Sequence, residues 1–157
     1  MKRDAFLVSK YNVPGPRYTS YPTVPYWDGD SFSVSGWKKS VLKGLRFRES
    51  EKKTSISLYI PLPFCERMCT FCGCTKRITK NHLVEKPYIK ALLKELRMYA
   101  EILGHRPLIQ QLHLGGGTPT FFSAENLEDL LIGIFKIADT ADEVEFSFEG
   151  HPNNTTK

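Results

Sequence analysis

Hydrophobic residues in the last two thirds of the chain follow two spacings, one typical of strands and the other of helices. The segments 55–62, 108–114 and 143–149 are rich in β-branched or aromatic residues and are predicted to be strands. The segments 86–103 and 123–138 lie between them and repeat hydrophobic residues at helical spacing. Strands separated by helices predict an α/β fold of βαβ units, with a parallel sheet and right-handed crossovers.

Each of these two predicted helices has one hydrophobic face that we expect to cover the sheet. The face of 86–103 consists of Ile89, Leu92, Leu93, Leu96 and Leu103. The face of 123–138 consists of Leu127, Leu130, Leu131, Ile134 and Phe135. Ser123 is the predicted N-cap of the second helix, because a serine hydroxyl can accept a first-turn N–H and acidic residues follow it.

The first 53 residues have a different pattern, and we predict a boundary between segments 1–53 and 54–157. Residues 11–30 carry four prolines and two glycines, which exclude a sustained helix or a central strand. We expect this segment to be extended and to lie across a surface, because its four tyrosines and one tryptophan need packing partners. A helix is predicted over 32–45 from the spacing of Trp37, Val41, Leu42 and Leu45.

Composition and charge limit the classes of protein that fit. With 157 residues and 41% hydrophobic composition, the chain can form one ordinary domain or a piece of one. The sequence contains neither a signal peptide nor a hydrophobic run of the roughly 18–20 residues that a membrane span needs, so we expect a cytoplasmic protein. The net charge of +5 is concentrated in 38–53. It fits a solvated helix face or a surface for a polyanionic ligand, and no base-reading motif points to nucleic acid.

All four cysteines, Cys65, Cys69, Cys72 and Cys74, lie within ten residues after the first predicted strand. Thiols in a reducing compartment bind metal or do redox chemistry more often than they form disulfides. Thiolates suit both zinc and iron–sulfur clusters. Structural zinc sites usually draw ligands from two separate knuckles, and a second knuckle is missing here. Only Gly73 separates Cys72 from Cys74, which makes it awkward for both thiols to bind one centre.

Two further candidate motifs follow the second and third predicted strands. In parallel α/β folds, functional groups gather at the carboxyl ends of the strands. The run "GGGTPT" at 115–120 could bring its backbone close to a ligand, or it could be a tight turn before a helix. Glu149 could accept hydrogen bonds from a ribose diol, or it could be a solvated strand end. The shared location of all three motifs favours a functional site.

The spacing of Cys65, Cys69 and Cys72 after a first strand resembles the signature of the radical S-adenosylmethionine (SAM) superfamily. The resemblance implies that these three thiolates bind a [4Fe-4S] cluster with one iron open for SAM. One electron from the reduced cluster then cleaves SAM to a 5′-deoxyadenosyl radical. The resemblance also implies that this chain comprises the first three βα units of a partial TIM-like barrel, and that the rest of the barrel and a C-terminal domain are absent.

Longer segments narrow the resemblance to the oxygen-independent coproporphyrinogen III oxidases of heme biosynthesis. These segments are "YNVPGPRYTSYPT", "SLYIPLPFC", "CTFCGC" and "QLHLGGGTPT", and Cys74 belongs to the pattern. The implied reaction is oxidative decarboxylation of two coproporphyrinogen III propionates to vinyls, giving protoporphyrinogen IX. A heme chaperone of the same superfamily and a zinc-binding interaction module remain as alternative hypotheses.

The resemblance also implies residue roles and partners. The residues that match SAM-contacting positions are Tyr59, Phe71, Gly116, Gly117, Thr118 and Glu149. Tyr59 and Phe71 could also be ordinary packing residues, and Cys74 is a candidate on the substrate side. An electron donor such as a flavodoxin or ferredoxin is implied, as is a porphyrinogen substrate. The sequence departs from the family pattern at Pro61, where a histidine is usual, and at His151 and Asn154, where an acid and an arginine are usual.

Overall fold

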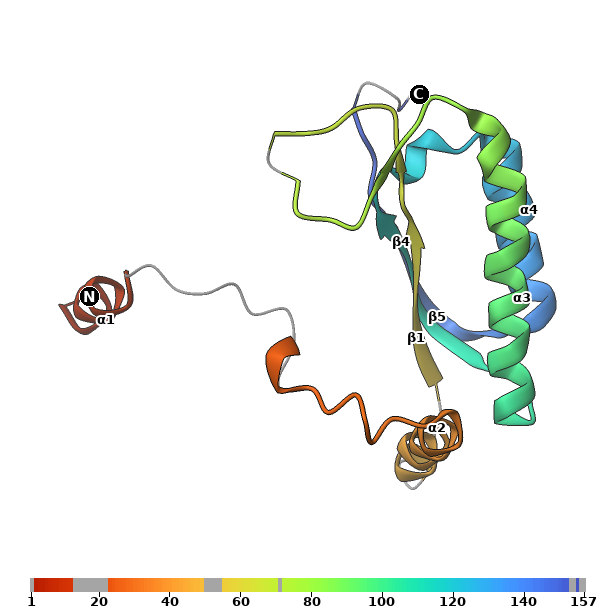
Figure 1. The fold of residues 1–157 in the computed structure, drawn as a ribbon, viewed down its shortest axis with the longest axis horizontal. Coiled ribbons are helices and arrows are strands. Elements are labelled where there is room, and N and C mark those ends of the chain that lie inside the picture. The colour runs from red at the N-terminus through yellow and green to blue at the C-terminus, as the bar shows by residue number, and fades with distance from the viewer. Residues whose placement is uncertain (1, 13–22, 50–54, 71, 153–154, 156–157) are drawn as a thin grey trace. The chain divides into compact units, whose positions relative to one another are not determined.

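The computed structural model describes residues 2–12, 23–49, 55–70, 72–152 and 155 (Figure 1). The chain divides into two compact units, Met1–Trp37 and Lys38–Lys157. Helix α1 (Lys2–Tyr11), which the sequence pattern did not predict, and the 3-10 helix η1 (Val24–Tyr26) belong to the first unit. Half of the predicted extended segment, residues 13–22, lies outside the described residues, and the described half includes the end of α1 and all of η1. The boundary after residue 53 stays a prediction.

The helix predicted over 32–45 is present as α2 (Val34–Glu49). It begins two residues later and runs four residues further than the hydrophobic spacing indicated. The boundary between the two units falls inside this helix, after Trp37.

The second unit is built on a three-stranded parallel sheet. Its strands are β1 (Ser55–Leu62), β4 (Leu108–Gly116) and β5 (Asp139–Phe148), in the order β1-β4-β5. The predicted parallel α/β arrangement is therefore confirmed. β5 begins at Asp139, earlier than the predicted start at 143, because Asp139 already pairs with Leu108 of β4. The pairing register between β4 and β5 then shifts further along the two strands. The polar start of β5 has no alternating hydrophobic pattern that could have revealed this pairing.

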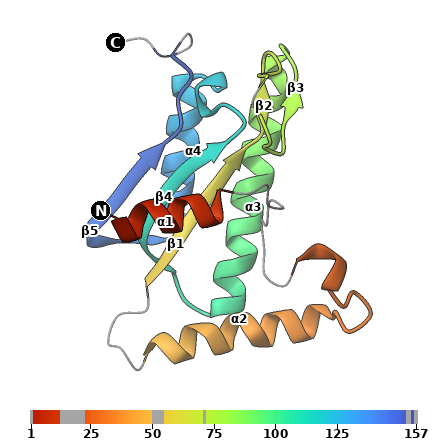
Figure 2. The same ribbon diagram turned by 90° about the vertical axis from the view of Figure 1, so that its left-hand side faces the viewer.

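Helices α3 (Glu85–Leu103) and α4 (Ala124–Ile137) cover the same face of this sheet (Figures 1 and 2). The largest fully buried side chains of the strands and helices include Leu62, Ile109, Leu130 and Ile134. The two helices pack closely where Gly133 meets Leu93, since a Cβ at Gly133 would collide with the leucine side chain. Neither α3 nor α4 lies on the opposite face of the sheet (Figures 1 and 2).

Phe135 faces the sheet as predicted, but its side chain is only partly buried. Its side chain is 38% exposed and lies edge-on to Phe146, with 6.0 Å between the ring centroids. Phe135 is at the margin of the hydrophobic face of α4, above the outermost strand β5, where the described sheet provides cover on one side only. Phe146 and Phe148 are exposed for the same reason.

Local signals set the start of α4 and the end of α3 where they were expected. Ser123 caps α4, because its Oγ accepts a hydrogen bond from the Asn126 backbone N–H at 3.2 Å. α3 ends at Gly104, whose φ of 73° is in the left-handed region that favours glycine. Among the helices that the structure describes, none combines the length and hydropathy needed to cross a membrane.

Candidate functional site

The cysteine loop is anchored at both ends by a small parallel sheet that the sequence did not predict. Strand β2 (Phe64–Cys65) pairs with β3 (Arg77–Ile78). The Arg77 N–H donates to the carbonyl of Pro63 at 2.7 Å, and the Thr79 N–H donates to the carbonyl of Cys65 at 2.9 Å. The loop that carries the other three cysteines therefore leaves and returns to one place beside the end of β1.

The four thiols differ in their surroundings, and all are free. Cys65 is buried, and its Sγ lies 3.2 Å from the Thr118 hydroxyl. Cys72 is half-buried and its N–H donates to the carbonyl of Cys69 at 3.3 Å, whereas Cys69 and Cys74 are exposed. Among the described residues, no group of three or more His, Cys, Asp or Glu side chains converges on a point that could hold a metal ion.

Cys72 and Cys74 interact with each other, and the interaction separates their acidities. The Cys74 backbone N–H lowers the pKa of Cys72, and the ammonium of Lys76 acts in the same direction against the effect of burial. The pKa of Cys74 is raised, chiefly because its thiol donates to Cys72 and faces that negative charge. The two thiols therefore lie close enough to hydrogen-bond to each other.

The glycine run follows β4 and is hydrogen-bonded to the entrance of the cysteine loop. Gly116 has φ 106°, which favours glycine, and a Cβ at Gly117 would lie 2.6 Å from the carbonyl carbon of Pro63. The Gly117 N–H donates to Leu62 O at 3.0 Å, and the Thr118 N–H donates to Phe64 O at 3.1 Å. At these two positions glycine is required by the packing of two loops, independently of any ligand.

Glu149 follows β5 and reaches the glycine run from the other side. Its backbone N–H donates to Leu114 O at 2.9 Å, which continues the strand ladder by one residue. One carboxylate oxygen accepts the Gly116 N–H at 3.3 Å, and the other lies 3.5 Å from Nε2 of His113. The side chain is 54% exposed, so the carboxylate also faces solvent.

Tyr59 lies beside these residues. Its ring stacks on the His113 ring with 5.4 Å between centroids, and its hydroxyl lies over Gly115. The pKa of Tyr59 is raised, first by burial and then by the negative charges of Glu149 and Cys74. The phenol is therefore a neutral hydrogen-bond donor at neutral pH.

The structure thus brings Tyr59, Gly116 and Glu149 together, with Gly117 and Thr118 joined to the cysteine loop. Phe71 lies outside the described residues, and so does Asn154. His113 was not among the predicted site residues, although its place in "QLHLGGG", alternating with hydrophobic residues just before the glycines, indicates the polar face of a strand. The roles assigned to all these residues stay predictions.

Two of the positions where the sequence departs from the family pattern, Pro61 and His151, make backbone hydrogen bonds in this chain. The carbonyl of Pro61 accepts a hydrogen bond from the Tyr88 hydroxyl at 2.7 Å, which fixes the end of β1 against α3. The backbone N–H of His151 donates to the Thr120 hydroxyl at 3.1 Å, which joins the segment after β5 to the segment after the glycine run. Both contacts support the same edge of the sheet.

Comparisons with known proteins agree on one family, although no protein-family model matches the sequence. The chain is 37% identical over 148 residues to the oxygen-independent coproporphyrinogen III oxidase of Synechocystis sp., covering 94% of this chain and 30% of that protein. A protein of the same name from Mannheimia haemolytica is 34% identical over 149 residues, covering 95% of this chain and 96% of that sequence.

The structural comparison agrees with these relatives. Coproporphyrinogen III oxidase (HemN) from Escherichia coli, described as a radical SAM enzyme, superimposes with a TM-score of 0.76 and is 28% identical. The match covers 96% of this chain and 31% of that protein. The chain therefore spans less than a third of the length of the Synechocystis and E. coli proteins.

Proposed function

The chain belongs to the oxygen-independent coproporphyrinogen III oxidase family, and from this premise we propose that it forms the cofactor-binding edge of a radical SAM enzyme. The reaction we assign to that enzyme is oxidative decarboxylation of coproporphyrinogen III to protoporphyrinogen IX. Support comes chiefly from the hydrogen bonds that join the three motif loops: Gly117 to Leu62, Thr118 to Phe64, and Gly116 to Glu149. These bonds gather thiols, glycines and a carboxylate at the carboxyl ends of three parallel strands, where α/β enzymes bind ligands.

We propose that Cys65, Cys69 and Cys72 hold a [4Fe-4S] cluster and that Cys74 stays outside the ligand set. Three thiols in a loop with anchored ends fit the donor chemistry of such a cluster. Only Gly73 separates Cys74 from Cys72, which makes it awkward for both thiols to bind the same centre. With SAM bound, the cluster would supply one-electron chemistry that removes a hydrogen atom from the substrate.

We propose that Tyr59, Phe71, Gly116, Gly117, Thr118 and Glu149 contact SAM. Glu149 would accept hydrogen bonds from hydroxyl groups, because its carboxylate is more than half exposed at the sheet edge. Gly116 also donates its N–H to Glu149 and so helps to orient that carboxylate. Tyr59 would donate a hydrogen bond from its phenol, which is 54% exposed on the same face and protonated at neutral pH.

The partners of the whole protein follow from the family and remain proposals. The substrate carries four carboxylates, and the net charge of +5 gives this chain an attractive field for such an anion. A flavodoxin or ferredoxin would donate the electron, in the cytoplasm. The face of the sheet opposite α3 and α4 would line the interior of a barrel.

Anaerobic reconstitution of this chain with iron and sulfide tests the proposed ligand set. Alanine at Cys65, Cys69 or Cys72 should abolish bound iron and sulfide and the visible absorption of the cluster, whereas Cys74→Ala should leave both nearly unchanged. Equal iron loss in the Cys74 variant would contradict the three-thiol assignment. Bound zinc without iron would favour an interaction module instead. Transfer of bound heme without SAM-dependent decarboxylation would favour a heme chaperone.

A further inference from the structure

The face of the sheet opposite α3 and α4 carries two polar rows that cross all three strands, the first joined by hydrogen bonds and the second by a ring stack and one hydrogen bond. The register places Ser57, Gln111 and Glu145 in one row, and Tyr59, His113 and Ser147 in the next. In the first row, the Ser57 hydroxyl donates to Gln111 at 2.7 Å, and the Gln111 amide donates to Glu145 at 3.0 Å. Barrel interiors are usually packed with branched hydrophobic residues, so the second row, which lies nearest the glycine run, indicates that this end of the face meets a polar ligand.

His113 is the centre of the row nearest the glycine run and makes three contacts there. Its Nδ1 lies 2.7 Å from the Ser147 hydroxyl, and its Nε2 lies 3.5 Å from the Glu149 carboxylate. Its ring stacks on Tyr59 at an interplanar angle of 17°. One side chain therefore contacts both Tyr59 and Glu149, the two SAM-contacting side chains proposed on this face.

The tautomer of His113 follows from its two polar neighbours. A neutral imidazole donates from one nitrogen and accepts at the other. If Nδ1 carried the proton, the lone pair of Nε2 would face the negative carboxylate of Glu149. If the Ser147 hydroxyl donates to Nδ1, then Nε2–H points at Glu149 and both contacts are attractive. The second arrangement is therefore favoured, and Ser147 sets it.

Gly115 provides an independent observation for the same cluster. A Cβ at Gly115 would lie 2.8 Å from Nε2 of His113 and 2.9 Å from the hydroxyl of Tyr59. The first glycine of the run thus leaves the space into which both side-chain tips extend, whereas Gly117 leaves space for the backbone of Pro63.

We propose that His113 is a positioning residue that holds the Glu149 carboxylate and the Tyr59 ring in their SAM-binding orientations, with Ser147 setting its tautomer. This inference rests on the proposed function. Glu149 is held by Gly116 through one oxygen and by His113 through the other, so loss of His113 leaves the carboxylate free to rotate about its remaining contact. The effect should appear in SAM affinity and not in cluster assembly.

The test compares His113→Phe, His113→Gln and the control Gln111→Leu in the reconstituted chain. Phenylalanine keeps the ring against Tyr59 but removes both nitrogens, whereas glutamine keeps an N–H donor for Glu149. The control changes the neighbouring polar row, which makes no contact with Glu149. SAM binding is measured by equilibrium dialysis with radiolabelled SAM, and iron and sulfide are measured in each sample.

We expect His113→Phe to weaken SAM binding about tenfold, which corresponds to ~1.4 kcal/mol. His113→Gln should recover most of this loss, and Gln111→Leu should bind like the unchanged chain. In a Glu149→Gln background, His113→Phe should have little further effect, because His113 acts through that carboxylate. Unchanged affinity in His113→Phe with an intact cluster, or fully additive losses in the double variant, would overturn the proposal.

A measurement without SAM keeps this proposal separate from the proposed function. A long-range proton–nitrogen NMR spectrum of the chain reports the protonation of each ring nitrogen of His113. We expect a proton on Nε2, an acceptor at Nδ1, and a shift of the Nε2 signal in Glu149→Gln. A proton on Nδ1 alone would overturn the proposed orientation even if the chain bound no SAM. An assembled cluster that fails to bind SAM, together with the expected tautomer, would instead count against the proposed function.

Discussion

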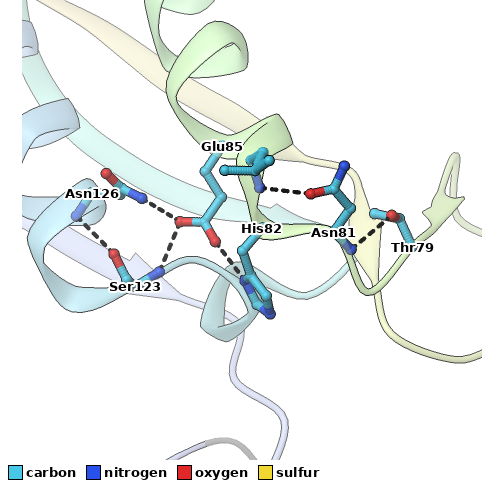
Figure 3. A network of polar contacts seen from close by, with 7 residues as sticks. Thr79, Asn81, His82, Glu85, Ser123 and Asn126 are labelled. Atoms are coloured by element: carbon cyan, nitrogen blue, oxygen red, sulfur yellow. Dashed lines mark hydrogen bonds and ion pairs between the residues drawn. The ribbon is translucent and has the colours of Figure 1, made fainter.

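Replacing Glu85 with glutamine should destabilise the fold by about 2 kcal/mol, and the reason lies in the network shown in Figure 3. Glu85 is 1% exposed and lies in the first turn of α3. One of its oxygens accepts the Ser123 N–H at 3.0 Å and the Asn126 amide at 2.6 Å, and the other lies 2.6 Å from Nδ1 of His82. The carboxylate therefore joins the beginning of α3 to the N-terminus of α4.

The magnitude follows from the change in two of these hydrogen bonds. A hydrogen bond to a charged group contributes roughly 1.5–3 kcal/mol, and a neutral one contributes roughly 0.5–1.5 kcal/mol. In Glu85→Gln the amide oxygen can still accept from Ser123 and Asn126, but both bonds lose the assistance of the negative charge, at about 1 kcal/mol each. His82 is half exposed and can change its tautomer to accept from the new amide, so we assign no further cost to it.

Urea unfolding followed by circular dichroism measures this loss. With a slope of roughly 2 kcal/mol per molar urea, the midpoint should fall by about 1 M. Glu128→Gln is the matched control, because Glu128 is exposed on α4 and its replacement should change stability by less than about 0.5 kcal/mol. A midpoint for Glu85→Gln within the error of the Glu128 variant would refute the assigned role of the network.

The pH dependence gives a second check with a definite sign. Burial alone would raise the pKa of Glu85, but the hydrogen bonds from Asn126, Ser123 and His82 outweigh it and lower the pKa below its usual 4.5. A lowered folded-state pKa means that the stabilisation is complete above pH 4.5 and is lost as the pH falls through the folded-state value. The stability gap between the unchanged chain and Glu85→Gln should therefore shrink in acid, and a gap independent of pH would contradict this account.

Four further predictions concern the site and its supports. In an otherwise unchanged chain with an intact cluster, Glu149→Gln should weaken SAM binding roughly tenfold to a hundredfold by dialysis, and unchanged affinity would refute the ribose assignment. Gly117→Ala should lower the urea midpoint by the equivalent of roughly 1–3 kcal/mol, because its Cβ would collide with Pro63. Gly44→Ala is the control and should not lower the midpoint, because the space at its Cβ is open. Ser123→Ala should cost about 1 kcal/mol through loss of the α4 N-cap, and thermal unfolding would check it. The chain by itself should self-associate through the outer side of β5 and should form neither 5′-deoxyadenosine nor protoporphyrinogen; catalytic formation of both would show that these residues suffice.

Local patterns determined the elements of the second unit. Hydrophobic spacing depends only on neighbours along the chain, and it predicted β1, α3, β4 and α4 close to their observed bounds, with the Ser123 cap. It also predicted that the cysteines, the glycines and Glu149 follow three parallel strands. A common edge for the three motifs followed from that topology alone, because the carboxyl ends of parallel strands meet there.

Only the tertiary structure decided which residues meet at that edge and which hydrogen bonds and packing contacts they make with one another. The β2–β3 pairing, the early start of β5 and the exposure of Phe135 depend on segments that are distant in sequence. The same holds for the contacts of His113 and for the burial of Glu85 against the N-terminus of α4. No local pattern distinguishes a histidine that meets a carboxylate from one that faces water. The difference arises from strand register, which brings side chains more than thirty residues apart into contact and so sets their hydrogen bonds and acidities.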